Sequence, residues 1–221
     1  MPEPYRVGVY YAPQINDPLW QSGCTWLGRD AATGLTLPQP GLPGLVDHTA
    51  EPRRYGLHAT LKAPFVLRCG FDDFLQAATK FASQCHSFDL PALAVTELRG
   101  FLALCLTTAS PQLQHLADAC VMAFEPQRQP ESDSEQAKRG LGKTDRQRAQ
   151  IARFGYPFVF EDFHFHMTLT GHMQNNPYFE AAMTHFKASL AHTRRVESLA
   201  IFVEETKGSP FRLVSHLPFA S

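Results

Sequence analysis

The sequence predicts an α+β protein of two similar lobes, each an antiparallel sheet with helices packed outside it, related by a pseudo-two-fold axis around a central cleft. Segments that alternate apolar and polar residues are interspersed with segments of helical periodicity, and the order strand, helix, strand, strand occurs twice. Val95 and Phe101 follow His58 by 37 and 43 positions, and Ile201 and Phe211 follow His166 by 35 and 45. We therefore expect residues 1–221 to form a single bilobal domain, with one of these histidines in each lobe.

The first half of the chain begins with a β-rich segment over residues 6–12, which predicts a strand. Asp17 and Pro18 provide a helix N-cap and a proline at the first helical position, which predict a short helix ending near Leu27. Residues 28–52 are rich in glycine and proline and predict a long surface loop. The same periodicities predict a strand over 57–63, a helix over 72–86, strands over 88–98 and 100–107 joined by a tight turn at Arg99-Gly100, and a helix over 111–124.

The second half opens with a polar insertion over residues 125–150, which we expect to lie near the cleft. Two capping-box patterns, Ser132 with Glu135 and Thr144 with Gln147, predict short exposed helices in this insertion. The second copy of the repeated order then predicts a strand over 163–170, a helix over 176–191, and strands over 198–204 and 211–216.

Two strands carry the same polar motif. Successive side chains of a strand point to opposite faces, so Phe163–Thr170 would place His164, His166, Thr168 and Thr170 on one face and apolar side chains on the other. By the same rule, the strand over 57–63 would place His58, Thr60 and Lys62 on its polar face. Each strand therefore presents a His-x-Thr pair, and the lobe symmetry would bring both pairs to one cleft.

A paired His-x-Thr arrangement suits hydrolysis of a cyclic phosphodiester. This reaction needs a base for the attacking water and an acid for the leaving oxygen, and imidazole can fill both roles near neutral pH. Each threonine hydroxyl could donate to a non-bridging phosphate oxygen. We predict that His58, Thr60, His166 and Thr168 are catalytic, and that no metal or other cofactor is required. His164 forms a His-x-His pattern with His166, but no further metal-ligand spacing accompanies it.

Further side chains are candidates for binding substrate. Lys62 would add positive charge to the polar face of its strand, and Thr170 continues the polar face that begins at His166. Tyr55 and Tyr10 could stack on a base or a sugar, although an aromatic side chain in a strand is more often part of the core. Arg128, between Pro126 and Pro130, could reach the substrate or could be a solvated surface charge.

The surrounding residues resemble those of a known superfamily. The two motifs, within Arg53-Arg54-Tyr55-Gly56-Leu57-His58-Ala59-Thr60-Leu61 and Phe165-His166-Met167-Thr168-Leu169-Thr170-Gly171, are similar to those of the 2H phosphoesterases. They most resemble a bacterial branch, DUF1045-like, that is associated with phosphonate-metabolism operons. The resemblance implies a metal-independent cyclic phosphodiesterase with two lobes around a cleft. It also implies a role for Arg128 and a substrate such as a phosphoribosyl 1,2-cyclic phosphate, in which Lys62 and Arg128 would hold a second phosphate.

Composition restricts the partners. The net charge of −1 over 221 residues disfavours binding to long nucleic acid but is compatible with a small anionic substrate. The five cysteines form no Cys-x-x-Cys pair, and neither a basic-apolar leader nor an 18-residue apolar run occurs, so we expect a cytoplasmic protein that does not associate with membranes. Two alternatives stay open: an RNA-end-processing ligase or nuclease of the same superfamily, and a protein that binds a nucleotide or sugar phosphate without turnover.

Overall fold

The computed structural model describes residues 3–173 and 175–220 and confirms the α+β class, with antiparallel sheets and helices outside them. A four-stranded sheet has the order β2-β1-β8-β9, a three-stranded sheet has the order β4-β5-β6, and β3 pairs with β7. The strands are β1 Arg6–Tyr11, β2 Ala59–Phe65, β3 Phe88–Leu90, β4 Leu93–Leu98, β5 Phe101–Leu106, β6 His166–Thr168, β7 Arg194–Val196, β8 Ser198–Glu204 and β9 Phe211–Pro218.

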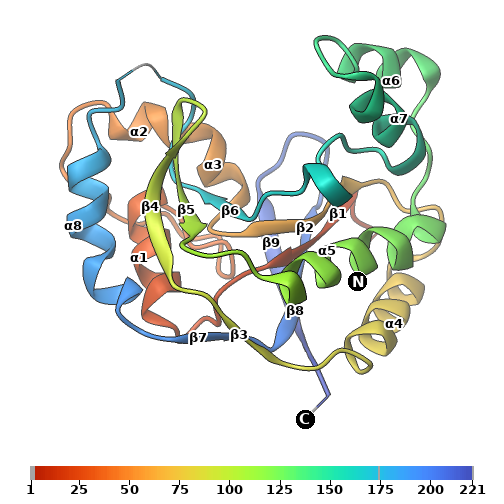
Figure 1. Ribbon diagram of the computed structural model, residues 1–221, viewed down its shortest axis with the longest axis horizontal. Helices are drawn as coiled ribbons and strands as arrows, with labels where there is room; N and C mark the ends of the chain where they lie inside the picture. The colour runs from red at the N-terminus through yellow and green to blue at the C-terminus, as the bar shows by residue number, and fades with distance from the viewer. Residues whose placement is uncertain (1–2, 174, 221) are drawn as a thin grey trace.

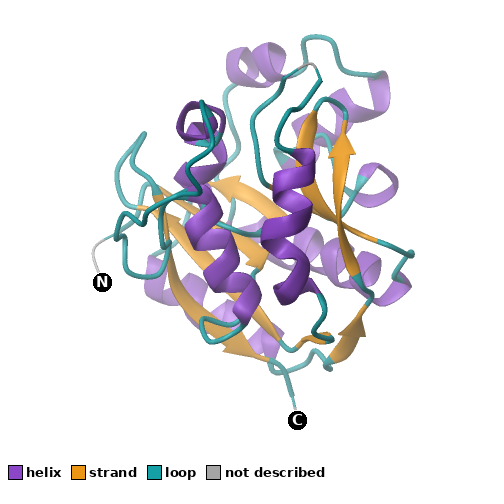
Figure 2. Ribbon diagram, turned by 90° about the vertical axis from the view of Figure 1, so that its left-hand side faces the viewer, coloured by secondary structure: helices purple, strands orange, loops and turns teal. Residues whose placement is uncertain are grey.

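Each of the two larger sheets has a pair of helices on its outer side (Figure 1). Helix α5 contacts β2 and α4 contacts β9, whereas α8 contacts β4 and packs against α1. Figure 2 faces this second pair and shows two helices in front of the strands. The main helices are α1 Pro18–Leu27, α4 Phe71–Ala82, α5 Pro111–Phe124 and α8 Phe179–Leu190. No helix among the described residues is both long enough and apolar enough to cross a lipid bilayer.

The hairpin that follows each histidine motif joins the sheet that contains the strand of the other motif. The β4–β5 hairpin comes after β2 in the chain but pairs with β6, where Cys105 lies opposite His166 and Ala103 opposite Thr168. The β8–β9 hairpin comes after β6 but pairs with β1, where Arg6 lies opposite Glu204. The two halves of the sequence repeat therefore exchange their hairpins, and both halves of the chain contribute strands to each of the two larger sheets.

Residues 28–52 differ from the loop that their composition predicts. Two short helices, α2 Leu45–His48 and α3 Ala50–Tyr55, occupy its end and continue beyond it. Arg53 holds this region together, because its guanidinium donates to the carbonyl oxygens of Leu27 and Val46 at 2.6 and 2.8 Å. Leu27 is distant from Arg53 in the sequence, and the segments that form α2 and α3 show no helical periodicity of apolar residues. A local sequence pattern therefore does not reveal these two helices.

Other element boundaries also differ from those predicted. The predicted strand over 163–170 shortens to β6, because residues 160–162 form a 3₁₀ turn (η2 Phe160–Asp162) and only β5 is available as a partner. The predicted strand over 88–98 is divided into β3 and β4, because β3 pairs with β7 and β4 pairs with β5. Strand β7 itself is not predicted, since its three residues show no alternation that distinguishes them from a loop.

The insertion contains the two helices that its capping boxes predict. After a 3₁₀ turn (η1 Glu125–Gln127), α6 spans Asp133–Arg139 and α7 spans Asp145–Phe154. Both capping boxes form, with Ser132 and Glu135 at the start of α6 and Thr144 and Gln147 at the start of α7. In Figure 1, α6 and α7 stand across from α2 and α3, above the sheets.

Candidate active site

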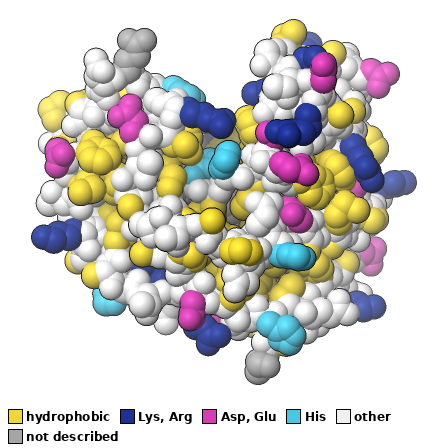
Figure 3. Space-filling view, viewed as in Figure 1, with side chains coloured by type: hydrophobic (Ala, Val, Ile, Leu, Met, Phe, Trp, Pro, Cys, Tyr) yellow, Lys and Arg dark blue, Asp and Glu magenta, His cyan; other side chains and the backbone are white. Residues whose placement is uncertain are grey.

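The two His-x-Thr motifs meet where the edges of the larger sheets come together. Strand β2 is the edge of the four-stranded sheet, β6 is the edge of the three-stranded sheet, and the two strands contact each other. His58, Thr60, His166 and Thr168 all line one cavity of about 460 Å³, which we call the central cavity. Figure 3 shows a hollow between the two upper parts of the molecule, with histidine side chains inside it and Lys or Arg side chains on both of its walls.

Both imidazoles are held in the same way. The Nδ1 atom of His58 lies 2.9 Å from the carbonyl oxygen of Gly56, and the Nδ1 atom of His166 lies 2.8 Å from that of His164. A carbonyl oxygen can only accept a hydrogen bond, so Nδ1 must carry the proton in each ring. The neutral imidazoles therefore have their lone pair on Nε2, the atom left for proton transfer. The carbonyl group of His164 thus orients the neighbouring histidine.

Burial favours the neutral form of both rings. It lowers the pKa of His58 to about 4, with a smaller contribution from the nearby His166, and the hydrogen bond to Gly56 opposes this change. Burial also lowers the pKa of His166, and the positive side chain of Arg99 acts in the same direction. Both histidines are therefore neutral at pH 7 in the free protein, which suits a general base.

The two predicted tyrosines lie beside His58. The ring of Tyr10 lies with its centroid 4.1 Å from the imidazole, and that of Tyr55 at 5.8 Å. Tyr55 also stacks on Phe211 at 4.8 Å. Both tyrosines line the central cavity, but Tyr10 is fully buried and its hydroxyl has no hydrogen-bond partner among the described residues. This placement favours a role for Tyr10 in packing His58 into position.

Lys62 does not lie on the face that strand alternation predicts. The pairing of β2 with β1 shifts register, so that Thr60 lies opposite Tyr10 whereas Lys62 lies opposite Val9. Because Val9 and Tyr10 point to opposite sides of the sheet, this irregularity turns Lys62 away from the cavity and under α5. There it is 3% exposed, and its Nζ donates to Val121 O at 3.1 Å and to Glu125 Oε2 at 2.9 Å.

Arg128 joins the same buried cluster and does not line the central cavity. Its Nε donates to Glu125 Oε1 at 2.8 Å, and another guanidinium nitrogen donates to the carbonyl oxygen of Arg153 at 3.0 Å. Arg128 is only 6% exposed. The prediction that Lys62 and Arg128 bind substrate does not fit these positions, since both cations pair with Glu125 away from the central cavity.

Thr170 lines the central cavity, but its hydroxyl is engaged in the fold. It accepts hydrogen bonds from the backbone N–H of Leu102 and from the side-chain amide of Asn176, both at 3.0 Å. Thr170 is also fully buried. The bond from Leu102 connects the residues that follow β6 to β5, and this position favours a structural role for Thr170 over the predicted contact with substrate.

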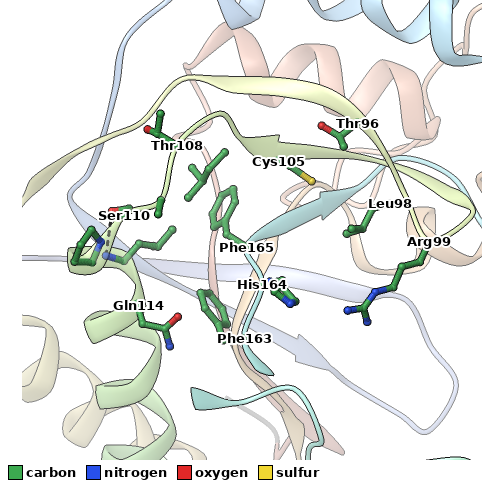
Figure 4. Close-up of a pocket in the computed structure, with 14 residues that line it drawn as sticks. Thr96, Leu98, Arg99, Cys105, Thr108, Ser110, Gln114, Phe163, His164 and Phe165 are labelled. Carbon is green, nitrogen blue, oxygen red and sulfur yellow. Dashed lines mark hydrogen bonds between the residues drawn. The ribbon is translucent and has the colours of Figure 1, made fainter. Parts of the chain in front are cut away.

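A second cavity adjoins the first and contains residues that the sequence motifs do not indicate. This side cavity, of about 310 Å³, shares Thr60 and His166 with the central cavity and is also lined by Arg99 and Lys143. A third cavity of about 660 Å³ lies beyond Arg99 and His164, and Figure 4 shows Arg99 extending toward that histidine. Arg99 comes from a hairpin turn and Lys143 from the insertion, so no strand pattern connects them to the motifs.

The described residues contain no group of three or more His, Cys, Asp or Glu side chains placed to hold a metal ion.

Comparison with known proteins identifies the family. Residues 60–212 match a family described as "Protein of unknown function (DUF1045)". The chain belongs to the DUF1045 family. This confirms the branch that the residues around the two motifs resemble. Two curated relatives align with nearly the whole chain, and both are named ribose 1,5-bisphosphate phosphokinase PhnN. The one from Janthinobacterium sp. (strain Marseille) is 37% identical and the one from Laribacter hongkongensis (strain HLHK9) is 36% identical, over 97% and 94% of this chain.

The DUF1045 chain spans about half the length of these curated relatives, 51% and 50% respectively. Two solved structures align over 99% of the chain and the whole of their own, each at 12% identity. One is described as a phosphoesterase and has a TM-score of 0.47, and the other is E. coli LigT complexed with 3'-AMP and has a TM-score of 0.46.

Proposed function

We propose that this protein is a metal-independent phosphoesterase that hydrolyses a small cyclic phosphodiester by paired-histidine acid/base catalysis. The observation that carries the proposal is the matched pair of imidazoles on one cavity. Each has Nδ1 tied to a backbone carbonyl oxygen, and each is followed by a threonine that lines the same cavity. A protein that only binds a phosphate has no need of two titrating groups held in this way.

The proposed reaction uses the two Nε2 atoms in sequence. Neutral His58, which has the pKa lowered to about 4, takes a proton from the attacking water while the water oxygen bonds to phosphorus. Protonated His166 gives its proton to the leaving ester oxygen as the P–O bond breaks. The negative charge of a bound phosphodiester favours protonation of His166, which offsets the effect of burial. Thr60 and Thr168 donate to the non-bridging oxygens, where negative charge increases.

The names of the relatives support a ribose phosphate as the substrate class. The activity in their names concerns a ribose bisphosphate, but it belongs to proteins about twice as long as this chain. The triplet Gly142-Lys143-Thr144 lies between α6 and α7, whereas a phosphate-binding loop of kinases follows a strand. We therefore favour a cyclic ribose phosphate in phosphonate metabolism over phosphoryl transfer from a nucleotide, and expect the reaction to take place in the cytoplasm.

The proposal can be tested with a panel of cyclic phosphates in the presence of EDTA. Ribose 1,2-cyclic phosphate and nucleoside 2',3'-cyclic phosphates are incubated with the wild-type protein, His58→Ala and His166→Ala. His192→Ala is the matched control, because this exposed histidine lies outside the central cavity. We expect turnover in EDTA that either active-site substitution lowers roughly 10²-fold or more and the control does not. Activity that is lost in EDTA and restored by zinc or manganese would contradict a metal-independent reaction, and binding without turnover would favour the non-catalytic alternative.

A further inference from the structure

The side cavity contains positive charge that the proposed chemistry does not use. It opens from the central cavity at Thr60 and His166, and Arg99 and Lys143 line it together. Arg99 comes from the turn between β4 and β5, and Lys143 precedes α7 of the insertion, so the two cations reach the cavity from different parts of the fold. A group bound between them would lie beside the reacting phosphate on the His166 side.

No carboxylate in the cavity neutralises these cations. Asp162 is the one acidic residue that lines it among the described residues, and its carboxylate accepts two hydrogen bonds from Arg146, both at 2.8 Å. Within residues 3–173 and 175–220, neither Arg99 nor Lys143 forms an ion pair. The Nζ of Lys143 lies 4.9 Å from the centroid of the Phe158 ring, which fixes its position without cancelling its charge. The side cavity therefore has positive charge without a counterion among the described residues, which suits an anion.

The backbone of Arg99 provides an independent observation. Its φ is +50°, Gly100 follows with a φ of +86°, and Leu98 pairs with Phe101 across the turn. Two successive positive φ angles between paired strands define a turn that favours asparagine, aspartate or glycine at its first position. Arginine pays a conformational penalty there, and strained residues of this kind cluster at ligand sites. The turn directs this side chain toward His164 and the cavities on either side of it (Figure 4).

We propose that Arg99 and Lys143 form a second anion subsite, which holds a phosphate monoester on the same substrate whose cyclic phosphate reacts between the histidines. This inference rests on the proposed function and makes its substrate class specific: a cyclic sugar phosphate with a second phosphate. Two charge-assisted hydrogen-bond donors suit the several oxygens of a phosphate group. These two residues take the role that the sequence assigns to Lys62 and Arg128, which are buried and share the carboxylate of Glu125.

The test compares two substrates that differ only in the second phosphate: ribose 1,2-cyclic phosphate with and without a 5-phosphate. The variants are Arg99→Asn, which suits the turn and removes the charge, Lys143→Gln, and both together. Lys138→Gln is the matched control, because it removes an exposed positive charge from the same insertion outside the side cavity. The wild type should have the higher kcat/KM on the doubly phosphorylated substrate. Each substitution should reduce this preference about 10-fold and the pair about 10²-fold, as expected for hydrogen bonds to a charged group.

Binding of ribose 5-phosphate, measured by calorimetry, separates this inference from the proposed function. We expect Arg99→Asn and Lys143→Gln each to weaken it about 10-fold, and the control to leave it unchanged. If these losses appear but no cyclic phosphate is hydrolysed, the subsite stands and the proposed function fails. If cyclic phosphates are hydrolysed but neither the substrate preference nor ribose 5-phosphate binding changes, the subsite is refuted. Equal losses on both cyclic substrates would also refute it, because the cations would then hold the reacting phosphate.

Discussion

Glu125→Gln tests whether Lys62 and Arg128 are structural. The substitution removes the negative charge shared by two cations that are 3% and 6% exposed. Breaking a buried ion pair costs about 3–5 kcal/mol of folding free energy, because the remaining charge has no counterion. Two features favour the lower end of this range: Lys62 still donates to Val121 O at 3.1 Å and Arg128 to Arg153 O at 3.0 Å. We therefore expect a loss of about 3 kcal/mol.

Thermal unfolding measures this loss. For a protein of this length, 1 kcal/mol corresponds to about 2–4 °C, so the Tm of Glu125→Gln should fall by about 6–12 °C. Glu205→Gln is the matched control, because Glu205 pairs with Arg212 at the surface and such pairs contribute at most about 1 kcal/mol. At a temperature where both variants are folded, kcat/KM should equal that of the wild type. A Tm change no larger than that of the control, with a fall in kcat/KM, would show that the reasoning is wrong and that the cluster serves the substrate.

Three further predictions concern the histidines, their packing and the insertion. The pKa of His58 is lowered to about 4 and that of His166 is also lowered, so kcat/KM on a cyclic phosphate should be maximal below pH 6.5. It should fall as the pH rises, because His166 then loses the proton that it gives to the leaving oxygen. A maximum above pH 8 would contradict the assignment of His58 as base and His166 as acid. Tyr10→Phe removes a buried hydroxyl that has no hydrogen-bond partner among the described residues, so the free energy of unfolding should stay the same or increase. A loss above about 1 kcal/mol in urea denaturation would reveal a hydrogen bond to that hydroxyl. Thr144→Ala deletes the N-cap of α7 and should lower the free energy of unfolding by about 1 kcal/mol in the same assay. An unchanged free energy of unfolding would contradict this prediction and would show that water replaces the cap.

Local sequence signals predict local structure well in this protein. The capping boxes at Ser132 and Thr144 specify the starts of α6 and α7, because each satisfies backbone donors within a single turn. The turn at Arg99-Gly100 is likewise a property of neighbouring residues. The motifs at His58 and His166 identify the central cavity, since each histidine and its threonine line the same face.

The failures have a common physical cause, which is dependence on partners far away in the chain. Alternation places Lys62 beside Thr60, but the register is set by β1 and shifts between these two residues. The helices α2 and α3 depend on Arg53, whose bonds reach Leu27 and Val46. Arg99 and Lys143 share a cavity only because the insertion folds toward the β4–β5 turn. Such contacts cannot be inferred from a window of neighbouring residues.

The exchanged hairpins have a consequence for how the active site is assembled. The pairing of β1 with β8 joins residues that are 198 positions apart, as in the bond from Arg6 to Glu204. Contacts of such long sequence separation form slowly, because a large loop must be closed before they contribute. Neither half of the chain can complete the four-stranded sheet by itself, so a ribosome-bound N-terminal half would hold His58 with β1 and β2 but without β8 and β9. Cleavage within the insertion should accordingly yield two inactive fragments whose activity returns only when they are mixed and fold together.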